Sequence, residues 1–140
     1  MHIAIKTYSF NKEEKLKSRK MIETLFRDGK AFSVFPYRVI FMPARLTTEK
    51  YPVQAGFSVS SRRFPRAVDR NRIKRLGREC YRLEKQVLYD ALQARSARMA
   101  VFFIYTDKKI PDFPTLRHKF SVILEKLVKE TNKWPADSVQ

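Results

Sequence analysis

Arginine and lysine side chains gather in one stretch of this sequence, residues 56–82. The only acids in the stretch are Asp69 and Glu79, and its centre reads Arg70-Asn71-Arg72-Ile73-Lys74-Arg75. Such an excess of positive charge on one element requires a polyanionic partner, and nucleic acid is the commonest one. Arg also outnumbers Lys here, and guanidinium groups pair with phosphates in a bidentate way and stack on bases. The stretch therefore favours RNA or DNA as the partner over a membrane surface.

The spacing of residues 68–90 predicts one amphipathic helix that presents these cations. Its buried stripe, at helical spacing, is Ile73, Leu76, Cys80, Leu83 and Val87. Its basic stripe, on another side of the helix, is Arg70, Lys74, Arg75, Arg78, Arg82 and Lys85. Gly77 lies between the stripes, and an interior glycine costs a helix about 1 kcal/mol relative to Ala. We expect close packing or a close ligand at Gly77.

Residues able to perform catalysis or bind a metal are sparse. His2 and His118 lie far apart without a partner motif, and one Cys with two His residues is too few for a zinc site. Cys80 falls on the apolar stripe, which predicts a core residue and not a nucleophile. The Glu13-Glu14 pair has a metal-binding reading, but a role at the start of a helix is favoured. The sequence predicts no catalytic residue and no metal site in the protein.

Composition indicates a single domain over residues 1–140, with residues 1–15 and 131–140 flexible. The chain has 30 basic and 14 acidic residues, a formal net charge of +16, which again points to an anionic partner. The start of the chain lacks the apolar stretch of a signal peptide, and the longest apolar run, Met99–Tyr105, is too short to span a bilayer. A single cysteine fits a reducing compartment. We predict a cytoplasmic location and no membrane partner.

The remaining patterns predict the elements that position the basic helix. Ser18 as N-cap and Gly29 at the end bound a helix over residues 19–28. Strands are expected at 35–42, at 53–59, where apolar residues alternate with small polar ones, and at 99–105, which is apolar throughout. A closing helix carries one apolar stripe: Leu116, Phe120, Ile123, Leu124 and Leu127. The fold class is α+β, with a mixed β-sheet, helices packed on it and the order α-β-β-β-α-β-α.

The aromatic residues before the basic helix allow two interpretations of their role. Most of them are expected in the core, while one or two could line a groove and stack on single-stranded bases. The sequence pattern does not say which of these aromatic residues line a groove. The residues concerned are Phe26, Phe32, Phe35, Tyr37, Phe41 and Phe57.

Together these residues resemble a known family. The string Gly56-Phe57-Ser58-Val59-Ser60, then Ala67-Val68, Arg70-Asn71-Arg72-Ile73-Lys74-Arg75-Leu76 and Arg78-Glu79, is similar to the signature of the bacterial ribonuclease P protein subunit. The resemblance implies a fold like that of ribosomal protein S5 domain 2, with a left-handed crossover around the basic helix. It also implies an endoribonuclease that removes the 5′ leader of precursor tRNA, in which the RNA subunit with bound Mg²⁺ is the catalyst. The implied partners are ribonuclease P RNA and precursor tRNA.

The resemblance assigns two sets of contact residues. The residues implied to contact the RNA subunit are Arg70, Asn71, Arg72, Lys74, Arg75, Arg78 and Arg82. A cleft between the first helix and the sheet would bind the single-stranded leader. The residues implied to line or edge it are Phe26, Tyr37, Ser58, Ser60 and Arg62.

Three alternative functions make different demands on the sequence. A structural rRNA-binding protein of the same fold would bind RNA without promoting cleavage. A DNA-binding helix-turn-helix protein would need a short helix just before the basic helix, where a strand is predicted instead, so DNA is not expected as a partner. A protein-only nuclease would need metal and acid–base residues that the sequence does not bring together.

Overall fold

One mixed sheet with helices on both faces makes up the fold, in a computed structural model that describes residues 9–46, 48 and 50–134. The strands are β1 (Lys30–Val34), β2 (Tyr37–Pro43), β3 (Val53–Val59) and β4 (Met99–Tyr105), in the order β1-β2-β4-β3. The helices are η1 (Lys12–Glu14), α1 (Arg19–Asp28), α2 (Ala67–Glu84), α3 (Gln86–Ala94) and α4 (Phe113–Thr131), of which η1 is a single 3₁₀ turn. The predicted α+β class is confirmed.

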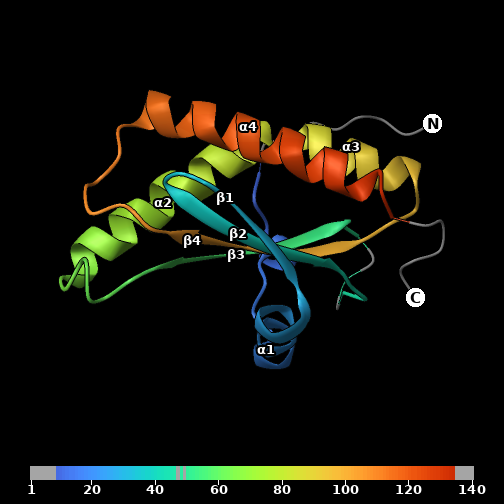
Figure 1. The fold of residues 1–140 in the computed structure, drawn as a ribbon, viewed down its shortest axis with the longest axis horizontal. Coiled ribbons are helices and arrows are strands. Elements are labelled where there is room, and N and C mark those ends of the chain that lie inside the picture. The colour runs from blue at the N-terminus through green and yellow to red at the C-terminus, as the bar shows by residue number, and fades with distance from the viewer. Residues whose placement is uncertain (1–8, 47, 49, 135–140) are drawn as a thin grey trace.

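The helices divide unequally between the two faces of the sheet. Figure 1 shows α2, α3 and α4 on one face, whereas α1 lies alone on the other. Side chains alternate between the faces, as the strand period of two requires. Tyr37, Val39 and Phe41 of β2 point into the large core beneath α2 and α4, and Ile40 points into a smaller core under α1. One face is therefore thickly covered, and the other is covered only where α1 crosses it.

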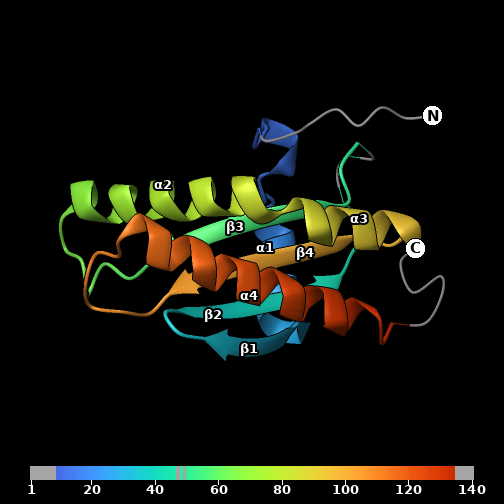
Figure 2. The same cartoon turned by 90° about the horizontal axis from the view of Figure 1, so that it is seen from above.

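The chain passes from β3 to its parallel neighbour β4 through α2 and α3. Figure 2 looks onto the helical side of the sheet. There β3 runs to the left, α2 returns to the right nearer to the viewer, and β4 again runs to the left, below β3 in the view. This path from β3 to β4 is a left-handed crossover. Crossovers between parallel strands are right-handed in nearly all proteins. The left-handed crossover expected from the family resemblance is thus present, while the likeness to ribosomal protein S5 remains a prediction.

The basic helix is shorter than predicted, because the single helix expected over 68–90 is two helices that meet at Lys85. Lys85 was predicted on the exposed basic stripe, but its side chain is only 2% exposed and forms an ion pair with the buried Glu14. Val87, predicted to be buried, is exposed, and Leu88 and Tyr89 fill the core instead. The helical stripe thus shifts by one residue at the junction, which a single continuous period could not predict.

The flexibility expected at the two ends of the chain stays a prediction, but the described parts of these ends make contacts with the domain. Glu14 is fully buried, and Lys15 forms a bridge with Ala55 of β3. At the other end α4 extends to Thr131, whose side chain is buried. The rest of the two predicted flexible ends, 1–8 and 135–140, lies outside the described residues.

The predicted caps of α1 are where the sequence places them. The Ser18 hydroxyl accepts a hydrogen bond from the Met21 N–H at 3.1 Å. Gly29 ends the helix, but in an extended conformation with φ −73°. A Cβ at Gly29 would lie 2.6 Å from the Leu25 carbonyl oxygen. Close packing at the helix end, not a left-handed backbone, explains this glycine.

Candidate nucleic-acid interface

The outer side of α2 is a strongly cationic surface. Ile73, Gly77, Cys80 and Tyr81 face the core, and this burial fixes the orientation of the helix. The opposite side carries the predicted contact residues. Exposed on it are Asn71, Arg72, Arg75 and Arg78, and half-buried at its margins are Arg70, Lys74 and Arg82. The structure therefore brings all seven predicted RNA-subunit contacts onto one helix.

The three acids of α2 are already engaged by arginines, and Glu84 accepts from Arg117 of α4 at 2.6 Å. Arg66 donates to Asp69 at 3.0 Å, just before the helix begins, and Arg82 donates to Glu79 one turn away. The hydrogen bond from Arg82 lowers the pKa of the Glu79 carboxyl. Within the described residues, Arg72, Arg75 and Arg78 form no ion pair. Their guanidinium groups are available to phosphate oxygens.

Arg70 differs from the other arginines of α2. Its guanidinium donates hydrogen bonds of 2.8 Å to the carbonyl oxygens of Phe64 and Pro65. Phe64 itself is buried against Tyr105. Arg70 therefore ties the loop before α2 to the helix, and this structural role was not foreseen from the sequence.

The loop between β3 and α2, residues 60–66, holds two of the predicted leader contacts. The Ser60 hydroxyl accepts hydrogen bonds from the backbone N–H groups of Arg62 and Arg63, at 3.2 and 3.4 Å. Arg63 reaches across to the Thr106 carbonyl oxygen after β4. The Arg62 side chain is exposed. The loop is thus fixed from both sides, with Arg62 at its surface.

The sheet face under α1 is the second candidate surface. Strand register places Arg38, Ile104 and Ser58 side by side in one row, and Ile40, Phe102 and Gly56 in the next. A Cβ at Gly56 would lie 2.5 Å from the Phe102 ring, so glycine allows that ring to lie across β3. Phe26 of α1 packs edge-on against Phe102 at 5.2 Å and remains 49% exposed. An exposed ring packed on the row next to that of Ser58 and Arg38 suits a stacked single-stranded base.

Tyr37 does not belong to this surface. Predicted to line the leader cleft, it is 2% exposed and lies on the opposite face of the sheet, packed against Tyr105 and Phe120. The reason is the strand period: Tyr37 and Arg38 point to opposite faces. Arg38 and Ile104 are the residues of this face that sequence reasoning missed. Their signal was the alternation of residues 35–42, once the buried face was known.

Reactive side chains have ordinary roles. Within residues 9–46, 48 and 50–134, no three His, Cys, Asp or Glu side chains gather closely enough to hold a metal ion. Cys80 is fully buried, and burial raises the pKa of its thiol to about 12. His118 is exposed on α4, and His2 lies outside the described residues. The same described residues include no helix long and apolar enough to cross a membrane.

Comparisons with known proteins find relatives that match most of this chain. The chain is 43% identical over 112 residues to the ribonuclease P protein component of Porphyromonas gingivalis, covering 79% of this chain and 80% of the relative. It is 34% identical over 129 residues to that of Chlorobium phaeobacteroides, covering 85% and 88%.

Solved structures give the same result for the fold. The ribonuclease P protein of Thermotoga maritima superposes with a TM-score of 0.63 at 25% identity, over 81% of this chain and 96% of that one. That of Staphylococcus aureus gives a TM-score of 0.64 at 19% identity, over 83% and 96%. The sequence model of the Ribonuclease P family matches residues 10–128. With α2, the loop before it and the sheet face all inside the match, the chain belongs to the ribonuclease P protein family.

Proposed function

We propose that this protein is the protein subunit of a ribonuclease P ribonucleoprotein that removes the 5′ leader from precursor tRNA. The observation that carries the proposal is the meeting of two different surfaces at residues 60–66. One is the arginine face of α2, and the other is the sheet face with the exposed Phe26 ring. A subunit that binds a folded RNA and a single strand at once needs two such surfaces.

The α2 face is assigned to the RNA subunit. Arg72, Arg75 and Arg78 are exposed on successive turns of a helix whose other side is anchored in the core. Such a row of fixed cations can follow a phosphate backbone, and its affinity is sequence-independent and falls with salt. An RNA recognised by shape provides such a backbone.

The sheet face is assigned to the 5′ leader. Ser58, Ser60, Arg62 and Phe26 remain in the proposed contact set, and Arg38 joins them because it shares the row of Ser58. Aromatic stacking accepts any base, so this surface would hold leaders of different sequence. Tyr37 is left out of the set, because it lies in the core on the other face.

Mg²⁺ enters this proposal through the RNA partner. Hard cations such as Mg²⁺ take several oxygen ligands, carboxylates above all. The charged groups of the two faces are mostly guanidinium and ammonium, Asp69 and Glu79 are paired with arginines, and no three His, Cys, Asp or Glu side chains gather among the described residues. The donor set of these surfaces does not fit Mg²⁺, so the RNA subunit would hold the metal and perform the hydrolysis. The protein's arginines would screen repulsion between RNA phosphates.

Reconstitution tests the proposal directly. The purified protein is mixed with a bacterial ribonuclease P RNA at low magnesium, and cleavage of a precursor tRNA is measured. We expect cleavage when both subunits are present and none with the protein alone. Tight RNA binding without cleavage, repeated with RNA from several bacterial groups, would instead indicate a structural RNA-binding protein of this fold.

A further inference from the structure

A short segment before α1 carries cations that neither proposed surface includes. Residues 11–18, termed here the N-terminal strap, run along the outer edge of β3. The Leu16 N–H donates to the Ala55 carbonyl oxygen at 2.9 Å, as an added edge strand would. Along the strap Glu14 and Leu16 are buried, while Lys12 and Lys17 are exposed. Its buried side holds it to the domain and its other side is cationic.

Buried polar contacts fix the strap at Glu14. The Glu14 carboxylate accepts hydrogen bonds from the Lys85 ammonium and, at 2.6 Å, from the Tyr89 hydroxyl. The same carboxylate accepts the Asn11 N–H at 2.9 Å, and Lys85 also donates to the Ser9 carbonyl oxygen. Because Glu14 and Lys85 are 0% and 2% exposed, this cluster holds the strap in one place.

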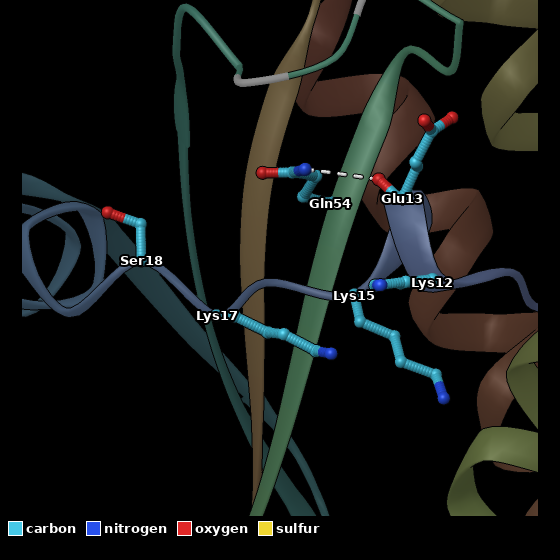
Figure 3. Close-up of a pocket in the computed structure, with 6 residues that line it drawn as sticks. All are labelled: Lys12, Glu13, Lys15, Lys17, Ser18 and Gln54. Carbon is cyan, nitrogen blue, oxygen red and sulfur yellow. Dashed lines mark hydrogen bonds between the residues drawn. The ribbon is translucent and has the colours of Figure 1, made fainter.

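The strap also borders a groove. Gln54 of β3, itself buried, donates to the Glu13 carbonyl oxygen at 3.0 Å. Around this contact lies a concave space of about 480 Å³, lined by Lys12, Glu13, Lys15, Lys17, Ser18 and Gln54. In Figure 3, the Lys15 and Lys17 side chains extend to one side of the strap and the Glu13 carboxylate points to the other.

Charge in this region is unbalanced. Within the described part of the chain, Lys12, Lys15 and Lys17 form no ion pair, although Glu13 is their neighbour. Lys15 lies 5.7 Å from the centre of the Phe10 ring, and Phe10 packs against Tyr81 of α2. Phe10 thus links Lys15 to α2, and all three lysines extend from a backbone that is already held in place, so little entropy is lost when they bind an anion.

The strap is attached at the C-terminal end of α2, beyond its arginine face. Lys85 directly follows the last residue of α2, and its side chain is buried against the strap. The Lys85 side chain is the group that reaches the strap. A backbone that follows Arg75 and Arg78 towards the end of α2 therefore meets the strap lysines next.

We propose that Lys12, Lys15 and Lys17 bind backbone phosphates of the same RNA that the arginine face of α2 engages, extending that contact around the edge of β3. This inference rests on the proposed function, because it takes ribonuclease P RNA as the partner. The strap contributes affinity through charge, and Glu14, Leu16 and Gln54 act only by positioning it.

The test uses K12Q/K15Q/K17Q, which removes three charges and leaves the anchors of the strap unchanged. Its matched control is K30Q/K126Q/K129Q, which removes three exposed lysines near the opposite edge of the sheet. Lys126 lies over the Phe32 ring as Lys15 lies over Phe10, so the two variants lose similar local contacts. Affinity of each full-length protein for ribonuclease P RNA is measured from 50 to 200 mM salt.

We expect the strap variant to bind ribonuclease P RNA more weakly. The negative slope of log K against log salt should become shallower by about 2, since three phosphate contacts are lost and each contributes about 0.7 to 0.9. The control should keep the wild-type slope. Equal slopes for strap variant and control would overturn the inference while leaving the proposed function intact. A loss confined to precursor tRNA would overturn the assignment to the RNA subunit. Failure of the wild-type protein to bind ribonuclease P RNA would instead overturn the proposed function.

Discussion

Gly77 allows α2 to pack closely against the sheet. A Cβ at this position would lie 2.7 Å from the Tyr37 hydroxyl oxygen and 3.4 Å from the Phe57 ring. Tyr37 is enclosed by Phe103, Tyr105 and Phe120, so its ring has little room to move away. The close packing expected at Gly77 from the sequence is confirmed, and the partner is Tyr37.

Replacing Gly77 with Ala should therefore destabilise the protein. A surface helix gains about 1 kcal/mol from this change, but overpacking of a core costs typically 1–3 kcal/mol. We expect a net loss of about 1 kcal/mol in the free energy of unfolding, measured by urea denaturation. The exposed neighbour Arg78→Ala, as control, should shift stability by less than about 0.5 kcal/mol. A gain in stability for G77A would show that Tyr37 moves aside.

Substitutions of Arg70 and Arg72 should differ in their effects on stability and on RNA binding. Arg70→Ala leaves two loop carbonyls without their donor, so we expect it to lower stability by about 1–2 kcal/mol and also to weaken RNA binding. Arg72→Ala should leave stability unchanged and reduce the salt slope of RNA binding by about 1. Thermal denaturation and salt-dependent RNA binding measure the two effects. Equal stability of both variants would argue against the loop-fixing role of Arg70.

At the scale of elements, the junction of α2 and α3 depends on the N-terminal strap. Lys85 is buried there with Glu14, and desolvation lowers the pKa of the Lys85 ammonium although Glu14 opposes that shift. Removing one partner of a buried pair leaves the other charge uncompensated, whereas apolar replacement of both is often tolerated. The pair is thus a point where two distant segments depend on each other.

Glu14→Gln should destabilise the protein by about 3 kcal/mol, because the Lys85 ammonium then lacks its counter-charge. The double variant E14Q/K85M should recover a substantial part of this loss. Chemical denaturation of both variants and of K85M alone gives the coupling energy between the two positions. Additive effects, with no recovery in the double variant, would contradict the described pairing.

Elements with a simple period were predictable and those set by distant contacts were not. The bounds of α1 and β4 follow from the Ser18 cap and from an unbroken apolar run, and both match the structure. The helix break at Lys85 depends on Glu14, 71 residues earlier, and no local pattern contains that information. The same holds for Tyr37, whose face could be assigned only once the register with β4 was known.

At the scale of the whole molecule, the two faces of the sheet differ in how fully helices cover them. The covered face buries most aromatic rings, while the face under α1 leaves Phe26 half exposed. The sequence predicted Phe26 for the leader surface and could not exclude the core. Its exposure follows from α1 standing alone on its side of the sheet, as Figure 1 shows.

Phe26→Ala should reduce the preference of the reconstituted enzyme for precursor over mature tRNA. Base–aromatic stacking is worth about 1–3 kcal/mol, so we expect at least a fivefold loss of that preference, with binding to the RNA subunit unchanged. Affinities for precursor and mature tRNA provide the measurement. Val122→Ala, an exposed apolar side chain on the far side of the sheet, serves as control. An unchanged preference in F26A would exclude this ring from leader binding.

The crossover between β3 and β4 has a consequence for synthesis of the chain. Val53 pairs with Met99, and α2 lies between these partners. Parallel pairing across so long a loop forms late, because the entropy of closing the loop is lost before the contacts are gained. The apolar side of α2 packs against α4 as well as β3, and α4 is the last element of the described residues. A nascent chain that has emerged only as far as α3 thus carries its arginines without the folded domain that positions them. We therefore expect the proposed RNA binding to begin only when translation of the domain is nearly complete.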